Sequence, residues 1–254
     1  MVQLVGLLGL VAFVAASFVV GGRILLLAAK TRHFPETSIG LSLFLSGGVG
    51  TALVILPLLR PGLDADALYF IHQTGSAMGH FGWVCLFVFV WRVFRPTQLW
   101  AACLFSVSTG VLLLGGAGLA VNLELGGGLA GGSAPPDVWF WMSLGARLVV
   151  YLWATFESFR YCEILKRRLA LGLSDQSVVD RFFYWGVCTA TVSVIWINLG
   201  VRSVMLDSEL AQSISYIVTA LLGFVVAGSL SLAFFPKKAQ TSHSSEAGAE
   251  ATPS

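Results

Sequence analysis

Charged residues are scarce in this chain. Asp, Glu, Lys and Arg make up 11% of its 254 residues, whereas hydrophobic residues make up 56%. A soluble domain carries about a quarter of its residues as charges, because it needs a polar surface. The few charges present here lie in short stretches between long apolar blocks. This shortage excludes an ordinary soluble domain and predicts a membrane protein whose first partner is the lipid bilayer.

Several kinds of chemical apparatus are missing as well. The 4 cysteines form no CxxC pair and lie in or at the ends of apolar segments, so they predict neither a disulfide framework nor a metal site. The chain has no GxSxG motif, no P-loop and no pair of carboxylates inside an apolar segment. It also has no basic cluster with interleaved aromatic residues, which nucleic acid would require. We therefore expect no enzymatic activity, no metal and no nucleic-acid partner.

Lysine and histidine are rare inside the apolar segments. Every lysine lies at a segment edge or beyond, so the last segment has none to carry a retinal Schiff base. The two histidines inside segments, His72 and His80, lie on the same segment about 12 Å apart, whereas a bis-histidine haem needs ligands from facing helices. We predict no cofactor, with a haem that takes a methionine as second ligand as the remaining alternative.

Seven apolar stretches are long enough to cross a membrane. A bilayer core of about 30 Å needs about 20 mostly apolar helical residues. The stretches that meet this length cover residues 3–29, 39–59, 67–91, 99–122, 138–162, 182–204 and 213–235. The sequence therefore predicts an all-α, polytopic bundle of seven transmembrane helices within residues 1–235. Residues 236–254 are polar and rich in small side chains, which predicts a disordered tail.

The basic residues are distributed unevenly between the breaks. Those after the first, third and fifth stretches and the tail contain Lys30, Arg32, Arg92, Arg95, Lys166, Arg167, Arg168, Arg181, Lys237 and Lys238. The other breaks contain Arg60 and Arg202. Because loops rich in Lys and Arg stay in the cytoplasm, we expect the N-terminus outside and the C-terminus in the cytoplasm. We expect the plasma membrane or a bacterial inner membrane.

This topology is shared by several unrelated classes of protein. Microbial rhodopsins, G-protein-coupled receptors and sugar exporters with a 3+1+3 helix arrangement all have seven spans and an external N-terminus, so topology alone assigns no function. The PQ dipeptide of those exporters and the external cysteine pair of the receptors are missing. A weak repeat favours 3+1+3, because GVGTA at 48–52 and GVCTA at 186–190 match, and Arg23 and Arg160 lie at nearly the same offset.

Polar residues form a stripe along the third stretch. Positions that differ by three and four residues share one face of a helix. The stripe consists of His72, Gly75, Ser76, Gly79, His80 and Trp83. We expect this face to turn toward the bundle, where small residues let another helix approach and the imidazoles form hydrogen bonds. The opposite face, with Phe70 and Phe81, suits lipid. The histidines are either ordinary packing contacts or part of a binding site.

Arg147 lies about nine residues into the fifth stretch, where an arginine is costly to expose to lipid. It needs an internal partner, which could be Glu124, Asp137, backbone carbonyls or an anionic ligand. Other polar side chains lie at similar depth. We therefore predict a polar pocket in the outer half, for ligand binding or proton sensing, formed by His72, Gln73, Ser76, His80, Arg147, Tyr151 and Asn198, with His80 at its floor.

A second charged cluster is predicted near the inner ends of the first and fifth stretches. Arg23 lies at a depth matching that of Glu157 and Arg160, and the last two are three residues apart on one helix. We predict an ion-pair cluster that holds these two spans together. A gate that opens during transport is the alternative.

The expected function follows from the free-energy cost of placing ionisable side chains inside a membrane. Ionisable residues inside a membrane are usually functional, and histidine titrates near physiological pH. We expect a non-enzymatic receptor-like or sensor-like protein that binds a small anionic ligand or a proton and passes the change to a separate partner chain. A small-solute or proton-coupled transporter with a 3+1+3 arrangement is one alternative. A membrane subunit that only packs with partner proteins is the other.

Overall fold

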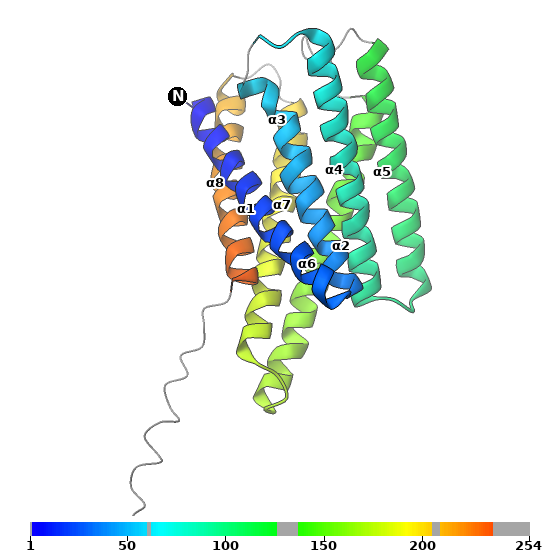
Figure 1. The fold of residues 1–254 in the computed structure, drawn as a ribbon, viewed down its shortest axis with the longest axis vertical. Helices are drawn as coiled ribbons and strands as arrows, with labels where there is room; N and C mark the ends of the chain where they lie inside the picture. Colours follow the sequence, from blue (N-terminus) through cyan, green and yellow to red (C-terminus); the bar gives the residue numbers. More distant parts are fainter. Residues whose placement is uncertain (1, 60–61, 126–136, 205–208, 236–254) are drawn as a thin grey trace, which may run out of the picture.

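The computed structural model describes the chain except for residues 1, 60–61, 126–136, 205–208 and 236–254, so the tail predicted to be disordered lies outside the described residues. The described residues form helices and contain no strand (Figure 1). These are α1 (Val2–Thr31), α2 (Phe34–Ser42), the π-helix η1 (Leu43–Gly50), α3 (Thr51–Leu59), α4 (Ala65–Phe94), α5 (Leu99–Leu125), α6 (Val138–Ala170), α7 (Gln176–Val204) and α8 (Glu209–Phe234).

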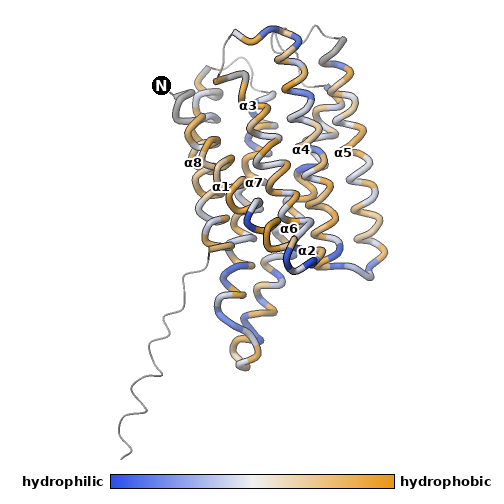
Figure 2. Tube along the Cα trace, viewed as in Figure 1, coloured by the Kyte–Doolittle hydropathy of each residue, from blue (hydrophilic) through white to orange (hydrophobic). Residues whose placement is uncertain are grey.

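Seven helical spans are long and apolar enough to cross a membrane, which confirms the predicted multi-pass helical bundle. The second span is continuous through α2, η1 and α3. Figure 2 shows that hydrophobic residues predominate along the bundle. Phe70 and Phe81 are 70% and 57% exposed on the outside of the bundle, so they face lipid as predicted. The two ends of the bundle are called here the Asp64 end, where α4 begins, and the Arg95 end, where α4 terminates.

The seven spans pack side by side in the order of the chain. α1 contacts α8 and the second span, and each later span contacts the next one, so the ring closes. α4 also contacts α6 across the ring. α5 therefore takes a place in the ring like every other span.

Two glycines bring neighbouring backbones into contact. A Cβ atom on Gly82 of α4 would lie 2.5 Å from the backbone nitrogen of Ser46 in η1. A Cβ atom on Gly115 of α5 would lie 2.8 Å from the backbone nitrogen of Ser143 in α6. Only a residue without a side chain permits such approach, which is the usual role of small residues between membrane helices. These contacts determine the relative depth of the helices that surround the interior.

The π-helix lies in the middle of the second span, over the sequence LFLSGGVG. Its wider turns interrupt the α-helical hydrogen-bond pattern, and π-helical turns are frequent at functional sites. Thr51 donates its hydroxyl to the carbonyl of Ser46 at 2.8 Å, so one freed acceptor is satisfied by a side chain. This segment presents Ser46, Gly47 and Gly50 to the interior of the ring.

The end of the fifth span and the start of the sixth span lie beyond the limits predicted from the sequence. α6 continues to Ala170, eight residues beyond the predicted end, and α7 begins at Gln176, six residues before its predicted start. The hairpin that they form extends beyond the other helices and carries many hydrophilic residues (Figures 1 and 2). Apolar length identifies only the part of a helix that crosses the bilayer, whereas this hairpin is stabilised by its own cluster around Cys162, Leu165 and Val179.

Candidate ligand-binding site

A cavity of about 530 Å³ lies inside the ring. All seven spans contribute to its wall, through α1, η1, α3, α4, α5, α6, α7 and α8. Along α7 the wall extends from Val192 to Arg202, a rise of about 15 Å at 1.5 Å per residue. The cavity therefore occupies the half of α7 nearer the Asp64 end. Its volume is in the range of pockets that hold small molecules, about 300–1,000 Å³.

The wall is mostly apolar, and its polar groups are few. The apolar side chains come from α1, α3, α5 and α7 and are Leu10, Phe13, Val54, Ile55, Leu119, Val192, Ile195 and Leu199. The polar ones include His72, Gln73, Ser76, Arg147 and Arg202. A pocket of this kind suits a ligand that is largely apolar and is oriented by a small number of polar contacts.

Arg147 is held in an aromatic corner of the cavity. Its guanidinium carbon lies 4.1 Å from the ring centre of Trp83 and 4.8 Å from that of Trp196. The two indoles meet edge to face at 5.5 Å. The Nη2 group donates to the hydroxyl of Ser143 at 2.7 Å, while the buried Nε has no hydrogen-bond partner among the described residues. The ring faces stabilise the positive charge, and one N–H group remains available.

The side chain of Glu124, one of the possible partners of Arg147, lies outside the described residues, so only the backbone positions of the two residues are compared. Because Gly115 packs against the backbone of Ser143, these two residues lie at the same depth. Glu124 lies nine residues beyond Gly115 toward the Asp64 end, whereas Arg147 lies four residues beyond Ser143 in the other direction. At 1.5 Å per residue their backbones are about 20 Å apart along the bundle, a distance that an arginine and a glutamate do not bridge.

Asp137, another of the possible partners, does not pair with Arg147. Asp137 precedes Arg147 by ten residues on the same helix, a rise of about 15 Å. Its carboxylate caps α6 by accepting from the backbone nitrogen of Phe140 at 2.8 Å, and it also accepts from the side chain of Asn122. The ion pairs among the described residues do not involve Arg147.

His80 lies behind the cavity wall and supports it. Its side chain is 6% exposed; Nδ1 is 2.7 Å from the carbonyl of Ser76 and Nε2 is 3.3 Å from the hydroxyl of Ser143. A carbonyl can only accept, so we assign the proton to Nδ1. Nε2 then accepts from Ser143, whose oxygen accepts from Arg147. His80 therefore holds Ser143 in place, and the prediction that it forms the cavity floor is corrected.

Other polar residues of α4 do reach the cavity. His72, Gln73 and Ser76 all line it. Gln73 donates from Nε2 to the carbonyl of Ala120 at 3.2 Å, which joins α4 to α5. Nδ1 of His72 is buried and has no hydrogen-bond partner among the described residues. Nε of Arg147 and Nε1 of Trp196 are likewise buried, belong to cavity-lining residues and have no hydrogen-bond partner among the described residues.

Tyr151 lines the cavity, but Asn198 does not. The amide nitrogen of Asn198 lies 2.9–3.1 Å from the hydroxyl and carbonyl oxygens of Ser215 and from the hydroxyl of Thr219. This group therefore links α7 to α8 and has its partners within the protein. The structure thus brings together His72, Gln73, Ser76, Arg147 and Tyr151 at the cavity, and leaves His80 and Asn198 in the surrounding layer.

Trp196 and Ser143 belong to this site but were not predicted from the sequence. The face of α7 that lines the cavity consists of Val192, Ile195, Trp196, Leu199 and Arg202. The prediction from the sequence chose Asn198 on α7, whose side chain points toward α8 and not into the cavity. A tryptophan in the middle of a span, at a depth similar to that of an unpaired arginine on the preceding span, was the available signal.

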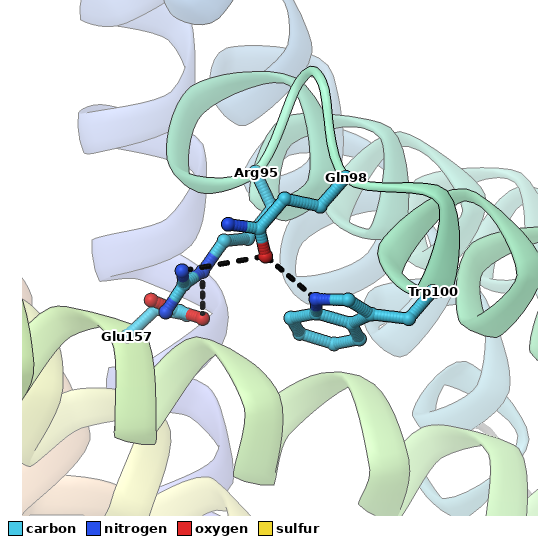
Figure 3. Close-up of polar contacts among 4 residues, drawn as sticks. All are labelled: Arg95, Gln98, Trp100 and Glu157. Atoms are coloured by element: carbon cyan, nitrogen blue, oxygen red, sulfur yellow. Dashed lines mark hydrogen bonds and ion pairs between the residues drawn. The ribbon is translucent and has the colours of Figure 1, made fainter.

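The charged cluster at the Arg95 end has a different composition from the predicted one. Glu157 of α6, 4% exposed, pairs with Nε of Arg95 at 2.7 Å. Figure 3 shows that Gln98 accepts from Arg95 at 3.4 Å and from the indole of Trp100 at 2.6 Å. The pair therefore joins α6 to the end of α4 and the start of α5.

The remaining two residues of the predicted cluster do not join it. Arg23 lies over the ring of Phe235, 4.4 Å from its centre, and Arg160 is exposed. The predicted clasp between the first and fifth spans is therefore corrected to one between the third and fifth, because α1 packs against the second span and α8 and does not contact α6.

Neither known proteins nor a metal-binding group of side chains indicates a function for this chain. No family model, curated protein or solved structure matches this chain. Within the described residues, no group of three or more His, Cys, Asp and Glu side chains could hold a metal ion. The fold and the cavity alone therefore define the class: this is a multi-pass helical membrane protein with an internal, mostly apolar cavity that contains an arginine.

Proposed function

We propose that this chain is a non-enzymatic, receptor-like or sensor-like membrane protein that binds a small anionic ligand at Arg147. The supporting observation is a guanidinium inside a membrane-spanning bundle with an unused buried N–H group and no described carboxylate in pairing distance. An arginine in the middle of a span costs about 2.5–3.5 kcal/mol on insertion scales and is usually retained for a function. An anion would provide the missing acceptor and balance the charge.

The contacts of His80 favour an anion over a proton as the ligand. Both ring nitrogens of His80 have partners, Ser76 and Ser143, and the directions of these hydrogen bonds suit the neutral ring. Protonation would place a second donor against Ser143, which already accepts from Arg147. The unused N–H group of Arg147 has no such conflict.

The closed Arg95 end favours binding over transport. Toward that end the bundle is filled by Leu86, Phe87, Val90 and Val150, which are 0–1% exposed. Beyond them the Arg95–Glu157 pair joins α4 to α6. A solute that crossed the protein would have to open both layers. α4 and α6 also carry His72, Ser76 and Arg147, so a ligand that shifts these helices could be sensed at the Arg95 end by a partner chain.

Thermal unfolding of the purified protein in phosphatidylcholine nanodiscs tests this proposal. We expect carboxylate or phosphate compounds to raise the melting temperature of the wild type and of Arg160→Gln, an exposed control, but not of Arg147→Gln. Equal shifts in all three proteins, or no shift in any, would contradict anion binding at Arg147. Counterflow of a labelled anion in proteoliposomes that is lost in Arg147→Gln would assign the site to a transporter instead.

A further inference from the structure

The cavity is much larger than a simple inorganic anion requires. A volume of about 530 Å³ has room for more than ten water molecules at about 30 Å³ each. Acetate or phosphate at Arg147 would leave most of this space filled by water against Val54, Ile55, Leu119 and Leu199. Water in contact with apolar walls is unfavourable compared with an apolar group in the same space. The size and the apolar wall of the cavity therefore suit a ligand that has an apolar part in addition to a negative charge.

The position of Arg147 determines how such a ligand would lie. Trp196, which contacts the guanidinium, is six residues from Arg202, so the cavity extends about 9 Å from the level of the charge toward the Asp64 end. Ile195 and Leu199 line this part of the wall. In the opposite direction Phe87 and Val150 close the core. The longer part of the cavity therefore lies on the Asp64 side of the charge, and a ligand body would extend mainly in that direction.

We infer that the ligand is an amphipathic anion with one carboxylate or phosphate head at Arg147 and an unbranched or ring-shaped apolar body along Ile195 and Leu199. This inference rests on the proposed function and narrows it to a class of ligand. The guanidinium of Arg147 binds the head, and the rings of Trp83 and Trp196 hold the guanidinium in place. The apolar wall receives the body, and each buried methylene group strengthens binding by about fourfold.

The test measures affinity for acetate, butanoate, hexanoate and octanoate in phosphatidylcholine nanodiscs by titration calorimetry. We expect affinity to rise roughly fifteenfold for each two-carbon step, since two methylene groups are added. Octanol, which lacks the charge, should bind much more weakly than octanoate. Suberate carries a second carboxylate that would lie toward Arg202 at the far end of the cavity, so binding of suberate tighter than that of octanoate would overturn the single-head assignment.

Two isoleucines of α7 provide a matched pair of variants. Ile195 lines the cavity, whereas Ile197 is 48% exposed on the outside. We expect Ile195→Ala to weaken octanoate binding about tenfold and Ile197→Ala to leave it unchanged. Equal effects of the two variants would contradict a ligand body at Ile195.

The outcomes separate this inference from the proposed function. If chain length has no effect while Arg147→Gln abolishes binding, the amphipathic class is wrong and anion binding at Arg147 stands. If neither carboxylates nor phosphate compounds bind, both the inference and the proposed function are wrong. Repeating the octanoate titration with phosphatidylglycerol in the nanodisc identifies the source: competition by this lipid would assign the same chemistry to a bilayer lipid, and its absence to a free amphiphile.

Discussion

Arg147 lies between the ring faces of Trp83 and Trp196 and donates one hydrogen bond to Ser143. These contacts hold the plane of the guanidinium in one orientation, and they leave Nε without a described partner. Hydrogen bonds that involve a charged group contribute about 1.5–3 kcal/mol. At the residue scale, the function proposed here therefore depends on the planar shape of this side chain as well as its charge.

Replacing Arg147 by lysine separates shape from charge. Lys keeps the positive charge, but it lacks the flat fork that fits a carboxylate and stacks on indoles. We expect Arg147→Lys to bind octanoate about tenfold more weakly than the wild type, and Arg147→Gln to lose about a hundredfold or more, in line with about 1.5–3 kcal/mol for a charged hydrogen bond. Calorimetry in nanodiscs measures both. Equal affinity of the lysine variant and the wild type would show that charge alone is recognised.

The imidazole of His80 depends on a glycine that faces it. A Cβ atom on Gly116 would lie 2.6 Å from Nε2 of His80, whereas a Cβ atom on Gly110 of the same helix would meet nothing within 4 Å. We expect Gly116→Ala to push the ring away from Ser143 and to lower the free energy of unfolding by about 1–3 kcal/mol. Gly110→Ala should raise it slightly, because alanine is the better helix former. Thermal unfolding compares them, and equal stability of the two variants would contradict this account.

At the scale of helices, α4 and α6 are connected at two levels. The chain of hydrogen bonds through Ser143 joins them beside the cavity, and the Arg95–Glu157 pair joins them at the Arg95 end. Both side chains of the pair are largely buried, at 14% and 5% exposure. Removing one partner of a buried pair costs about 3–5 kcal/mol, since the other charge is left uncompensated.

A double-mutant cycle tests which helices this pair joins. We expect Arg95→Gln and Glu157→Gln each to destabilise the protein, and the double variant to lose much less than the sum of the two. Arg23→Gln should show no such coupling to Glu157→Gln, because Arg23 contacts Phe235. The exposed Lys166–Glu163 pair on α6 is the matched control and should show no measurable coupling. Coupling of Arg23 to Glu157 would restore the clasp expected from the sequence.

The helices themselves were largely predictable, and their contacts were not. Apolar length located all seven spans, and the three- and four-residue spacing on α4 identified a face whose His72 and Ser76 line the cavity. The sequence also indicated that Arg147 turns inward. The sequence could not predict how α7 is rotated about its axis. Trp196 faces the cavity and Asn198 does not, but either orientation would bury a polar or aromatic side chain.

At the scale of the whole molecule, the cavity lies toward the Asp64 end of the ring. The α6–α7 hairpin projects from the opposite end (Figure 1). The positive-inside rule predicts, as an expectation to be tested, that the Asp64 end lies outside and the hairpin in the cytoplasm. In that orientation the ligand would enter from outside, and a partner chain would meet the hairpin and the Arg95 end.

Labelling of introduced cysteines tests this orientation. Asp66 and Asp175 are both exposed and lie at opposite ends of the bundle. We expect a membrane-impermeant maleimide to label Asp66→Cys in intact cells and Asp175→Cys only in inverted vesicles. The wild type, whose four cysteines lie within helices of the bundle, serves as the control for background labelling. The reverse pattern would place the cavity on the cytoplasmic side.

Local properties of the chain were enough to predict seven helices that can cross a membrane, and to predict that the guanidinium of Arg147 turns inward. Both conclusions follow from the cost of moving charge and backbone out of water, which each segment incurs on its own. The partners of the charged groups were decided by tertiary structure alone. Which atoms meet depends on the depth and rotation of neighbouring helices, and glycine contacts such as Gly115 with Ser143 establish these only when the bundle packs.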